Sequence, residues 1–368
     1  MHRIIKIIQS PRIFVFSLIN MIVLVFLGTM FQGELGLYQT QKIYFSSWFY
    51  WLGFLPMLGG RTIIAIMFIN LSGFLFRKNL WKIKKAGIII THLGGLILII
   101  GSAITAYFSY EGQMSILEGE KSNIIKDYYL KELAITVDDG TEIFFDQANL
   151  YEGNILKSDA IEFEIKVMKF YDNCKVVKKQ SICDECKGGF LKYDLIDIEP
   201  EVEYEMNHSA ITYEISGISE SVDGVYASTV YEVENNLIDI GTFNMKFVLR
   251  PERTYLPFSI HLIDFKEELY PGTDIAKSYS SDIKLIENNL SRDIRIQMNE
   301  PLRHKGYTFY QSSFNNLENK EISIFAVVKN YGRLFPYISS IIMCCGLLIH
   351  LFIKLFSSKK KSIKVKNA

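Results

Sequence analysis

Four apolar segments constrain this chain more than any other feature of its sequence. They are residues 13–31, 62–76, 86–107 and 334–353, and none of them contains Asp, Glu, Lys or Arg. About 20 helical residues cross the roughly 30 Å hydrocarbon core of a bilayer, so the first, third and fourth segments are long enough to span it. The second needs its approach at residues 57–60 or a locally thin bilayer. The sequence therefore predicts four transmembrane helices.

The first segment begins like a secretory signal peptide, because Arg3, Lys6 and Arg12 precede it. It is longer than the usual hydrophobic region of such a peptide, and no Ala-x-Ala-like cleavage site follows. We therefore expect it to be retained as a membrane helix.

The charge distribution predicts the topology. The chain has 40 basic and 40 acidic residues, but residues 108–332 hold 39 of the acidic residues against 23 Lys and Arg, a net charge of −16. The excess positive charge lies beside the apolar segments, at the N-terminus, in residues 77–85 and in residues 354–366. By the positive-inside rule, both termini are cytoplasmic and residues 108–332 are extracytoplasmic. We expect a multi-pass protein of the cell membrane.

The large acidic segment has the pattern of β-strands. Asp139-Gly140 separates two runs of β-forming residues, which is a strong hairpin signal, and residues 161–167 alternate apolar and charged side chains. The predicted fold is four transmembrane α-helices plus a large, mostly antiparallel β domain outside the membrane. The expected parts are residues 1–107 with three helices, 108–333 with the β domain, and 334–368 with the fourth helix and a basic tail.

Several common chemistries have no motif in this chain. It lacks G-x-S-x-G, a phosphate-binding glycine loop, H-E-x-x-H and the C-x-x-C-H of covalently bound haem. A net charge of −16 in residues 108–332 also argues against binding nucleic acid, because phosphates would be repelled. Hydrolase and nucleotide-binding functions are therefore disfavoured.

His92 is the one imidazole inside the third apolar segment. Burying a polar group without a partner costs about 1–3 kcal/mol, so a partner is expected. A neutral imidazole can bind haem iron, and small neighbours let a flat ring or another helix come close; these neighbours are Gly87, Thr91, Gly94 and Gly95. A hydrogen bond across a helix interface would satisfy His92 equally well, and both alternatives stay open at this point.

Two other histidines are weaker candidates. His350 lies four residues before Lys354, so its depth would allow pairing with His92, but snorkelling toward the headgroups is the simpler expectation. His304 precedes Lys305-Gly306, a turn signal, and is expected to be a solvated loop residue.

Three cysteines lie in the acidic segment: Cys174, Cys183 and Cys186. The Cys183/Cys186 pair can form a structural disulfide or a redox pair, and with Cys174 and His208 a Cys₃His metal site could be assembled. In an oxidising compartment, a structural disulfide with one spare thiol is favoured. Cys344 and Cys345 are expected to be small packing residues of the fourth helix.

The aromatic residues between the first two segments, residues 44–60, fit the outer membrane interface, where Tyr and Trp concentrate. An interfacial anchor is the simpler expectation, and a surface for haem or a partner protein is the alternative.

Several stretches together resemble the ResB/CcsB proteins of cytochrome c maturation, the system II pathway. They are residues 92–120 (HLGGLILIIGSAITAYFSYEGQMSILEGE), 299–314 (NEPLRHKGYTFYQSSF), 44–49 (YFSSWF) and the final helix from Pro336. The resemblance covers the membrane frame and both edges of the β domain. Its middle, about residues 150–290, matches weakly, and the cysteine loop has no counterpart that we assign.

The resemblance implies a haem-handling role beside a CcsA-like membrane protein that carries a tryptophan-rich WWD segment. This chain has only Trp48, Trp51 and Trp81 and no such segment. His92 matches the family's membrane histidine, an axial ligand to the iron of haem b in transit, and Gly94 and Gly95 would admit the porphyrin or a partner helix. The family's complex carries haem outward and joins it to apocytochrome c. No catalytic residue transfers, so this chain resembles a non-catalytic subunit of a haem lyase or synthase.

Two other classes of function remain possible. The first is a membrane-anchored thiol-redox or metal-binding protein that uses Cys183 and Cys186, in which case Cys→Ser replacement removes activity and haem is absent. The second is a non-catalytic membrane scaffold whose β domain binds a protein, in which case the protein purified with a CcsA-type partner has no Soret band.

Overall fold

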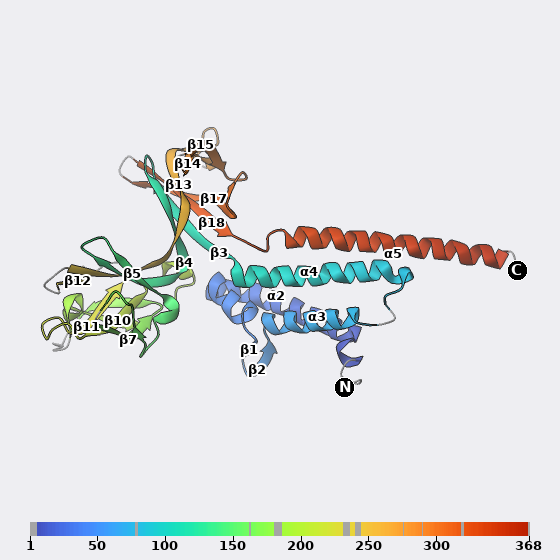
Figure 1. The fold of residues 1–368 in the computed structure, drawn as a ribbon, viewed down its shortest axis with the longest axis horizontal. Coiled ribbons are helices and arrows are strands. Elements are labelled where there is room, and N and C mark those ends of the chain that lie inside the picture. Colours follow the sequence, from blue (N-terminus) through green and yellow to red (C-terminus); the bar gives the residue numbers. More distant parts are fainter. Residues whose placement is uncertain are drawn as a thin grey trace. The chain divides into compact units, whose positions relative to one another are not determined.

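The computed structural model describes residues 6–77, 80–161, 163–179, 186–230, 236–239, 244–274, 276–288, 290–317 and 320–366. Two compact units divide the chain. The first, here the helical unit, is Met1–Tyr110 with Lys329–Ala368, and the second, here the β unit, is Glu111–Val328. Helices dominate the first unit and strands the second (Figure 1).

The helical unit contains four long or moderately long helices among its described residues. They are α2 (Pro11–Thr40), α3 (Gly60–Leu75), α4 (Ala86–Phe108) and α5 (Phe335–Lys366), with a π-helical turn η1 (Gln41–Phe45) after α2 and a 3₁₀ turn η2 (Ile83–Lys85) before α4. In the part of the chain that the structure describes, three spans are long and apolar enough to cross a membrane: Pro11–Phe45, Ile83–Phe108 and Phe335–Phe356. With 16 residues, α3 is only about 24 Å long at 1.5 Å per residue, so the fourth span stays a prediction.

Local sequence explains where α2 begins and bends. The Ser10 side chain caps the helix by accepting a hydrogen bond from the backbone N–H of Arg12 at 3.4 Å, and Pro11 occupies the first turn, where its missing N–H costs nothing. Near the other end, Gly36 has a φ of 76°, which only glycine adopts readily, and the helix kinks there.

A row of glycines lets α4 and α5 approach closely. Gly87, Gly94 and Gly101 are spaced by seven residues, so they share one face of α4, and all three are buried. A Cβ at Gly87 would lie 2.4 Å from the backbone nitrogen of His350, and one at Gly94 would lie 2.6 Å from Cγ of Met343. Contact between the two helices therefore depends on the absence of side chains on this face.

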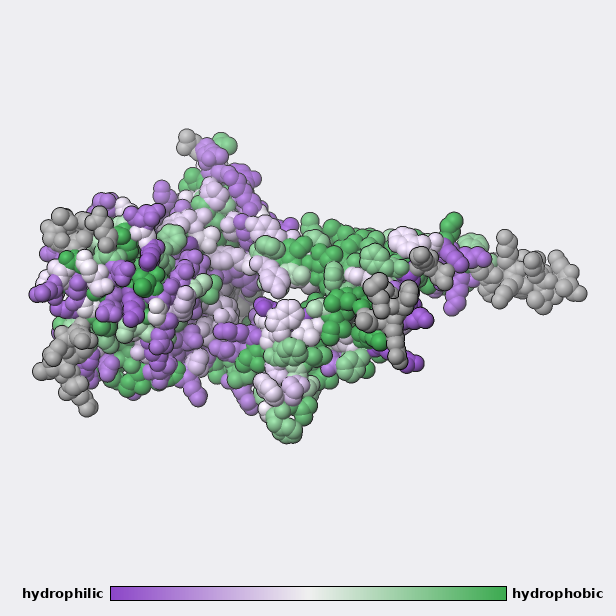
Figure 2. Space-filling view, turned by 60° about the horizontal axis from the view of Figure 1, so that its bottom comes forward, coloured by the Kyte–Doolittle hydropathy of each residue, from purple (hydrophilic) through white to green (hydrophobic). Residues whose placement is uncertain are grey.

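The outer surfaces of the helices are apolar. On α2, large side chains such as Phe16, Ile22 and Phe26 are each 62% exposed. Figure 2 shows hydrophobic residues over the helices on the face that it presents, whereas hydrophilic residues cover most of the strands. Water would disfavour such a surface and lipid would solvate it, so the chain is a membrane protein.

The aromatic segment after η1 forms a hairpin of β1 (Phe49–Leu52) and β2 (Leu55–Leu58). Tyr44 and Tyr50 are buried and pack edge to face, with ring centroids 4.8 Å apart. By contrast Trp51 is 70% exposed and Phe54, at the tip, 88%. This surface fits either expectation stated for the segment, the interfacial anchor or the docking surface.

The β unit is mostly antiparallel, as the sequence predicts. Among the described residues, its larger sheet has the order β15-β14-β13-β4-β3-β18-β17-β16, with β12 on β13 and β5 on β4. The strands are β3 (Tyr110–Leu117), β4 (Lys121–Val137), β5 (Glu142–Asp146), β12 (Asn236–Asp239), β13 (Asn244–Leu269), β14 (Ala276–Glu287), β15 (Leu290–Gln297), β16 (Leu302–His304), β17 (Tyr307–Leu317) and β18 (Lys320–Lys329). The predicted turn at Asp139-Gly140 is confirmed, with a φ of 86° at Gly140.

A second sheet packs on part of the first and closes a hydrophobic core. It has the order β11-β10-β7-β6, with β6 (Ile155–Leu156), β7 (Glu164–Tyr171), β10 (Ala210–Ser216) and β11 (Gly224–Thr229). Leu133 and Phe247 from the larger sheet meet Val167 and Tyr213 from the smaller one, and the rings of Tyr213 and Phe247 stack with centroids 5.4 Å apart. A separate hairpin joins β8 (Cys174–Lys178) and β9 (Tyr193–Asp197).

An ion cluster lies between β4, β5 and β13. Arg250 and Glu132 face each other in register across the strand pair, and Nε of Arg250 donates to Glu132 at 2.7 Å. The same guanidinium donates two bonds to Glu142, at 3.0 and 2.9 Å. The side chains of Arg250 and Glu132 are only 10% and 2% exposed, so each charge depends on the other for solvation.

Glu252, in the same region, should make the stability of the β unit depend on pH. Burial raises the pKa of Glu252 to about 7, and repulsion from Asp146, Asp127 and Glu132 adds to the shift. The pKa of this carboxyl is higher in the folded state than in the unfolded state. Its contribution to stability is therefore fully present below the unfolded-state pKa, and it is lost as the pH rises through the folded-state pKa.

We therefore expect Glu252→Gln to stabilise the chain at pH 8 by on the order of 1 kcal/mol, after allowance for solvent screening, and to have little effect at pH 4.5. Urea unfolding of the detergent-solubilised chain at both pH values measures the difference. If the difference in unfolding free energy between this variant and the wild type were the same at both pH values, the expected titration of Glu252 would be contradicted.

Candidate functional site

His92 lies on α4 with its ring held on two sides. Nδ1 is 2.8 Å from the carbonyl oxygen of Ile88, one turn earlier in the same helix. The imidazole stacks on the ring of Phe74 from α3, with centroids 4.4 Å apart and planes 22° apart. These two contacts hold the ring in one orientation.

The hydrogen bond leaves one nitrogen available as a ligand. A carbonyl oxygen can only accept, so Nδ1 carries the hydrogen of the neutral ring and Nε2 keeps its lone pair. Histidines that bind metals commonly donate their other N–H to such a carbonyl, which sets the tautomer. Within the described ranges, no hydrogen bond to Nε2 of His92 is found. The arrangement suits coordination of a metal by Nε2.

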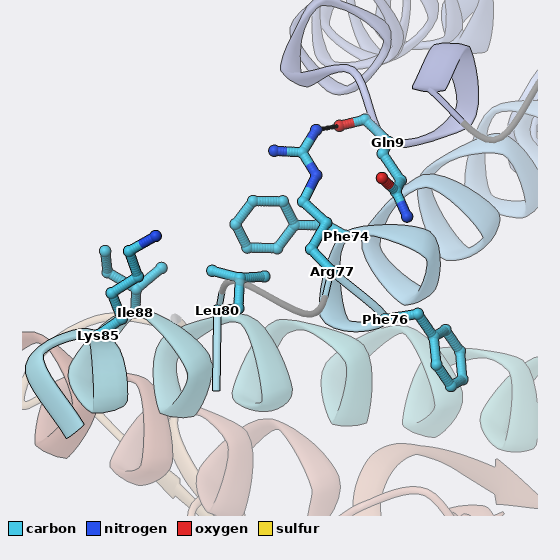
Figure 3. A pocket seen from close by; sticks show the side chains of 7 residues that line it. All are labelled: Gln9, Phe74, Phe76, Arg77, Leu80, Lys85 and Ile88. Carbon is cyan, nitrogen blue, oxygen red and sulfur yellow. Dashed lines mark hydrogen bonds between the residues drawn. The ribbon is translucent and has the colours of Figure 1, made fainter. Parts of the chain in front are cut away.

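The helical unit holds a pocket of about 600 Å³, whose lining Figure 3 shows. Such a volume is typical of small-molecule sites. Its lining residues are Gln9, Phe74, Phe76, Arg77, Leu80, Lys85 and Ile88. Phe74 and Ile88 are the two residues that hold the His92 ring, so the pocket and the histidine share a wall.

Arg77 gives the pocket a cationic side. Its guanidinium donates a hydrogen bond to the backbone carbonyl of Gln9, as Figure 3 shows, and lies 5.1 Å from the centroid of the Phe74 ring. Lys85 contributes a second positive charge from the start of α4. A pocket with aromatic and aliphatic walls and two cations suits an amphiphile with an anionic end.

The other residues predicted around His92 take different positions. Gly94 faces α5, whereas Gly95 faces α3, where an added Cβ would lie 3.4 Å from Cδ2 of Leu71. The role of both glycines toward haem stays a prediction. His350 lies against Gly87 on the α5 side, and its Nδ1 is buried without a hydrogen bond among the described residues. Five residues separate Gly87 from His92, about 140° around the helix, so the structure groups His92 with Phe74 and not with His350.

The cysteines do not assemble a metal site among the described residues. Cys186 is disulfide-bonded and Cys174 is free, while Cys183 lies outside the described residues. Cys174 is buried, and desolvation followed by repulsion from Asp197 raises the pKa of its thiol to about 11, so the thiol is unreactive at neutral pH. Cys344 and Cys345 are free and exposed on α5.

His304 is not the solvated loop residue expected from the sequence. It ends β16, its side chain is 16% exposed, and Nε2 lies 2.8 Å from a carboxylate oxygen of Glu287. Lys305 also pairs with Glu287, and its hydrogen bond, with that of His304, lowers the pKa of this carboxyl. The Lys305-Gly306 turn was predicted, but Glu287 comes from the distant strand β14, which no local pattern indicates.

Sequence reasoning also missed most of the pocket beside His92. Arg77 was visible only as a charge that ends a short apolar segment, and nothing linked Phe74 or Gln9 to His92. The one available signal was helical spacing, since Lys85, Ile88 and His92 follow an i, i+3, i+7 pattern on one face of α4.

The helices and sheets define the class: a membrane protein with a large, mostly antiparallel β unit. Residues 228–326 match the ResB-like family. The chain is also 20% identical over 300 residues to Protein NrfI of Wolinella succinogenes. The aligned region covers 79% of this chain and 30% of NrfI. It thus spans less than a third of that relative's length. These matches confirm the resemblance to the ResB/CcsB family, and the matched family segment includes His304 but not His92.

Proposed function

We propose that this chain is the haem-handling subunit of a membrane cytochrome c synthase complex. It helps to carry haem outward across the membrane for covalent attachment to apocytochrome c. The family match supports a place in cytochrome c biogenesis. The observation that carries the haem role is the His92 ring, whose Nδ1 is bonded to Ile88 so that Nε2 can bind iron.

The residues around His92 fit haem as a cargo. Phe74 supplies an aromatic wall that stacks on the imidazole, and the adjoining pocket of about 600 Å³ is of the size that small ligands occupy. Coordination by iron offsets the cost of burying the imidazole in a helix of this apolarity.

The proposed topology has four spans, both termini in the cytoplasm and the β unit outside. Its support is the positive charge at residues 77–85 and 354–366 against the net charge of −16 in residues 108–332. On this topology His92 is near the cytoplasmic side, about 10 Å from Lys85 along α4. Haem is therefore bound where it enters, and transport proceeds away from the cytoplasm.

The chain is proposed to act with a CcsA-like membrane protein that carries a WWD segment. That partner supplies the second axial ligand and the outer haem site, and the β unit docks the partner or apocytochrome c. No residue of this chain is given a catalytic role.

Co-expression with a CcsA-like protein, in a strain without its own cytochrome c maturation system, tests the proposal. The purified complex is expected to show a Soret band, and the strain to acquire covalently bound haem in a reporter cytochrome c. A complex that assembles fully but carries no haem and supports no attachment would leave the scaffold function as the explanation.

A further inference from the structure

We infer that the pocket lined by Arg77 and Lys85 receives the carboxylate edge of the haem whose iron His92 binds. This inference rests on the proposed function and adds to it the orientation of the cargo. The carboxylates lie toward the start of α4, and the rest of the ring lies along the face of the helix that carries His92.

The spacing along α4 places a cation and the ligand on one face. Lys85, the N-cap residue just before α4, and His92 are seven residues apart, which on an ideal helix is about two turns and 10 Å with about 20° of rotation. Ile88 lies between them and lines the pocket. A porphyrin whose iron is bound by Nε2 lies perpendicular to the bond between the iron and Nε2. Its plane can therefore extend along this face of the helix from the iron toward Lys85.

Arg77, just beyond the end of α3, completes the cationic end of the site. Its guanidinium is held over Phe74 at 5.1 Å and bonded to the carbonyl of Gln9. A guanidinium has five N–H donors, and the bond to Gln9 is the one side-chain hydrogen bond found for Arg77 among the described residues. A carboxylate can therefore be taken by its remaining donors in paired geometry.

The phosphate of a lipid headgroup has the same anionic chemistry, and the membrane supplies it at similar depth. The geometry favours the haem carboxylates because the cations are joined to the His92 site through Phe74, which lines the pocket and stacks on the imidazole. A lipid headgroup would not need its binding pocket to adjoin a histidine that can bind a metal. Lipid occupancy is accordingly the rival outcome of the experiment.

The experiment compares haem with its dimethyl ester, in which both carboxylates are blocked. Each is titrated into the haem-depleted complex in neutral-lipid nanodiscs, and binding is followed by the Soret band. We expect the wild type to bind haem at least about tenfold more tightly, because one lost charge-assisted bond pair is worth about 1.4 kcal/mol. The double variant Arg77→Gln/Lys85→Gln should bind both ligands equally, with an unchanged Soret maximum because His92 still binds iron.

Two further variants keep the result interpretable. Lys84→Gln removes an exposed neighbouring charge that does not line the pocket, and it should keep the full preference for haem. Arg77→Lys retains the positive charge but not the paired donors, so it should keep a smaller preference for haem than the wild type, which separates charge from any loss of folding through the Gln9 contact.

Three outcomes would overturn the inference. The first is a wild type that binds haem and the ester equally, and the second is a double variant that keeps the preference. The third is a double variant that loses bound anionic lipid from mixed-lipid nanodiscs while its preference for haem is unchanged, which would make the pocket a headgroup site. All three leave a Soret band that depends on His92, so they are distinguishable from failure of the proposed function, in which that band is absent.

Discussion

Replacing His92 by alanine is expected to remove haem from the purified complex while the complex still assembles. The loss of an axial ligand should lower the retained haem by more than about tenfold, because even the supporting partners of metal ligands change affinity by about 10–100-fold when they are mutated. The hydrogen bond to Ile88 lies within one helix and the stacking partner Phe74 remains, so the change should not disturb the fold. The haem content per complex, measured from the visible spectrum, gives the result.

Two matched variants sharpen this prediction. His350→Ala removes the other histidine near this depth, which lies on the α5 side of α4, and should leave haem content unchanged. His92→Cys offers a thiolate in place of imidazole and should retain some haem with a displaced Soret maximum. Full haem content with an unaltered spectrum in the alanine variant would show that His92 is not a ligand.

The second large effect is expected in the β unit, at Arg250. Arg250→Met removes the cation that satisfies Glu132, whose side chain is only 2% exposed, and also breaks the two bonds to Glu142. Removing one partner of a buried pair leaves an uncompensated charge and costs about 3–5 kcal/mol. For a unit of this size, we expect the melting temperature of the β unit to fall by roughly 6–20 °C.

A surface pair provides the control. Arg295 is 56% exposed and pairs with Asp282 through hydrogen bonds of 2.7 and 2.9 Å, the same kind of contact in a solvated setting. Arg295→Gln should cost at most about 1 kcal/mol, because water replaces the lost partner. Thermal unfolding of both variants in the same detergent compares them, and equal losses would mean that burial does not set the strength of the Arg250 cluster.

The sequence by itself determined the elements whose causes are local. Charge-free runs of about 20 residues must lie in lipid and be helical, because backbone groups cannot stay unpaired there. Alternation of apolar and charged residues made strands of the acidic segment, and Asp139-Gly140 produced the turn, because glycine accepts a φ of 86° without strain. His92 stood out for the same reason, as a polar side chain in a segment that offers it no water.

Only the tertiary structure decided which side chains meet. Phe74 and Arg77 lie on or just beyond α3, 18 and 15 residues before His92, and folding alone brings them to its ring and to the adjoining pocket. Gly94 and Gly95 are adjacent in sequence, yet they face different helices, because successive helical residues point about 100° apart. Likewise, Arg250 meets Glu132 through a strand register set by packing across more than a hundred residues. Local patterns specify elements, whereas contacts between distant elements depend on how their surfaces pack.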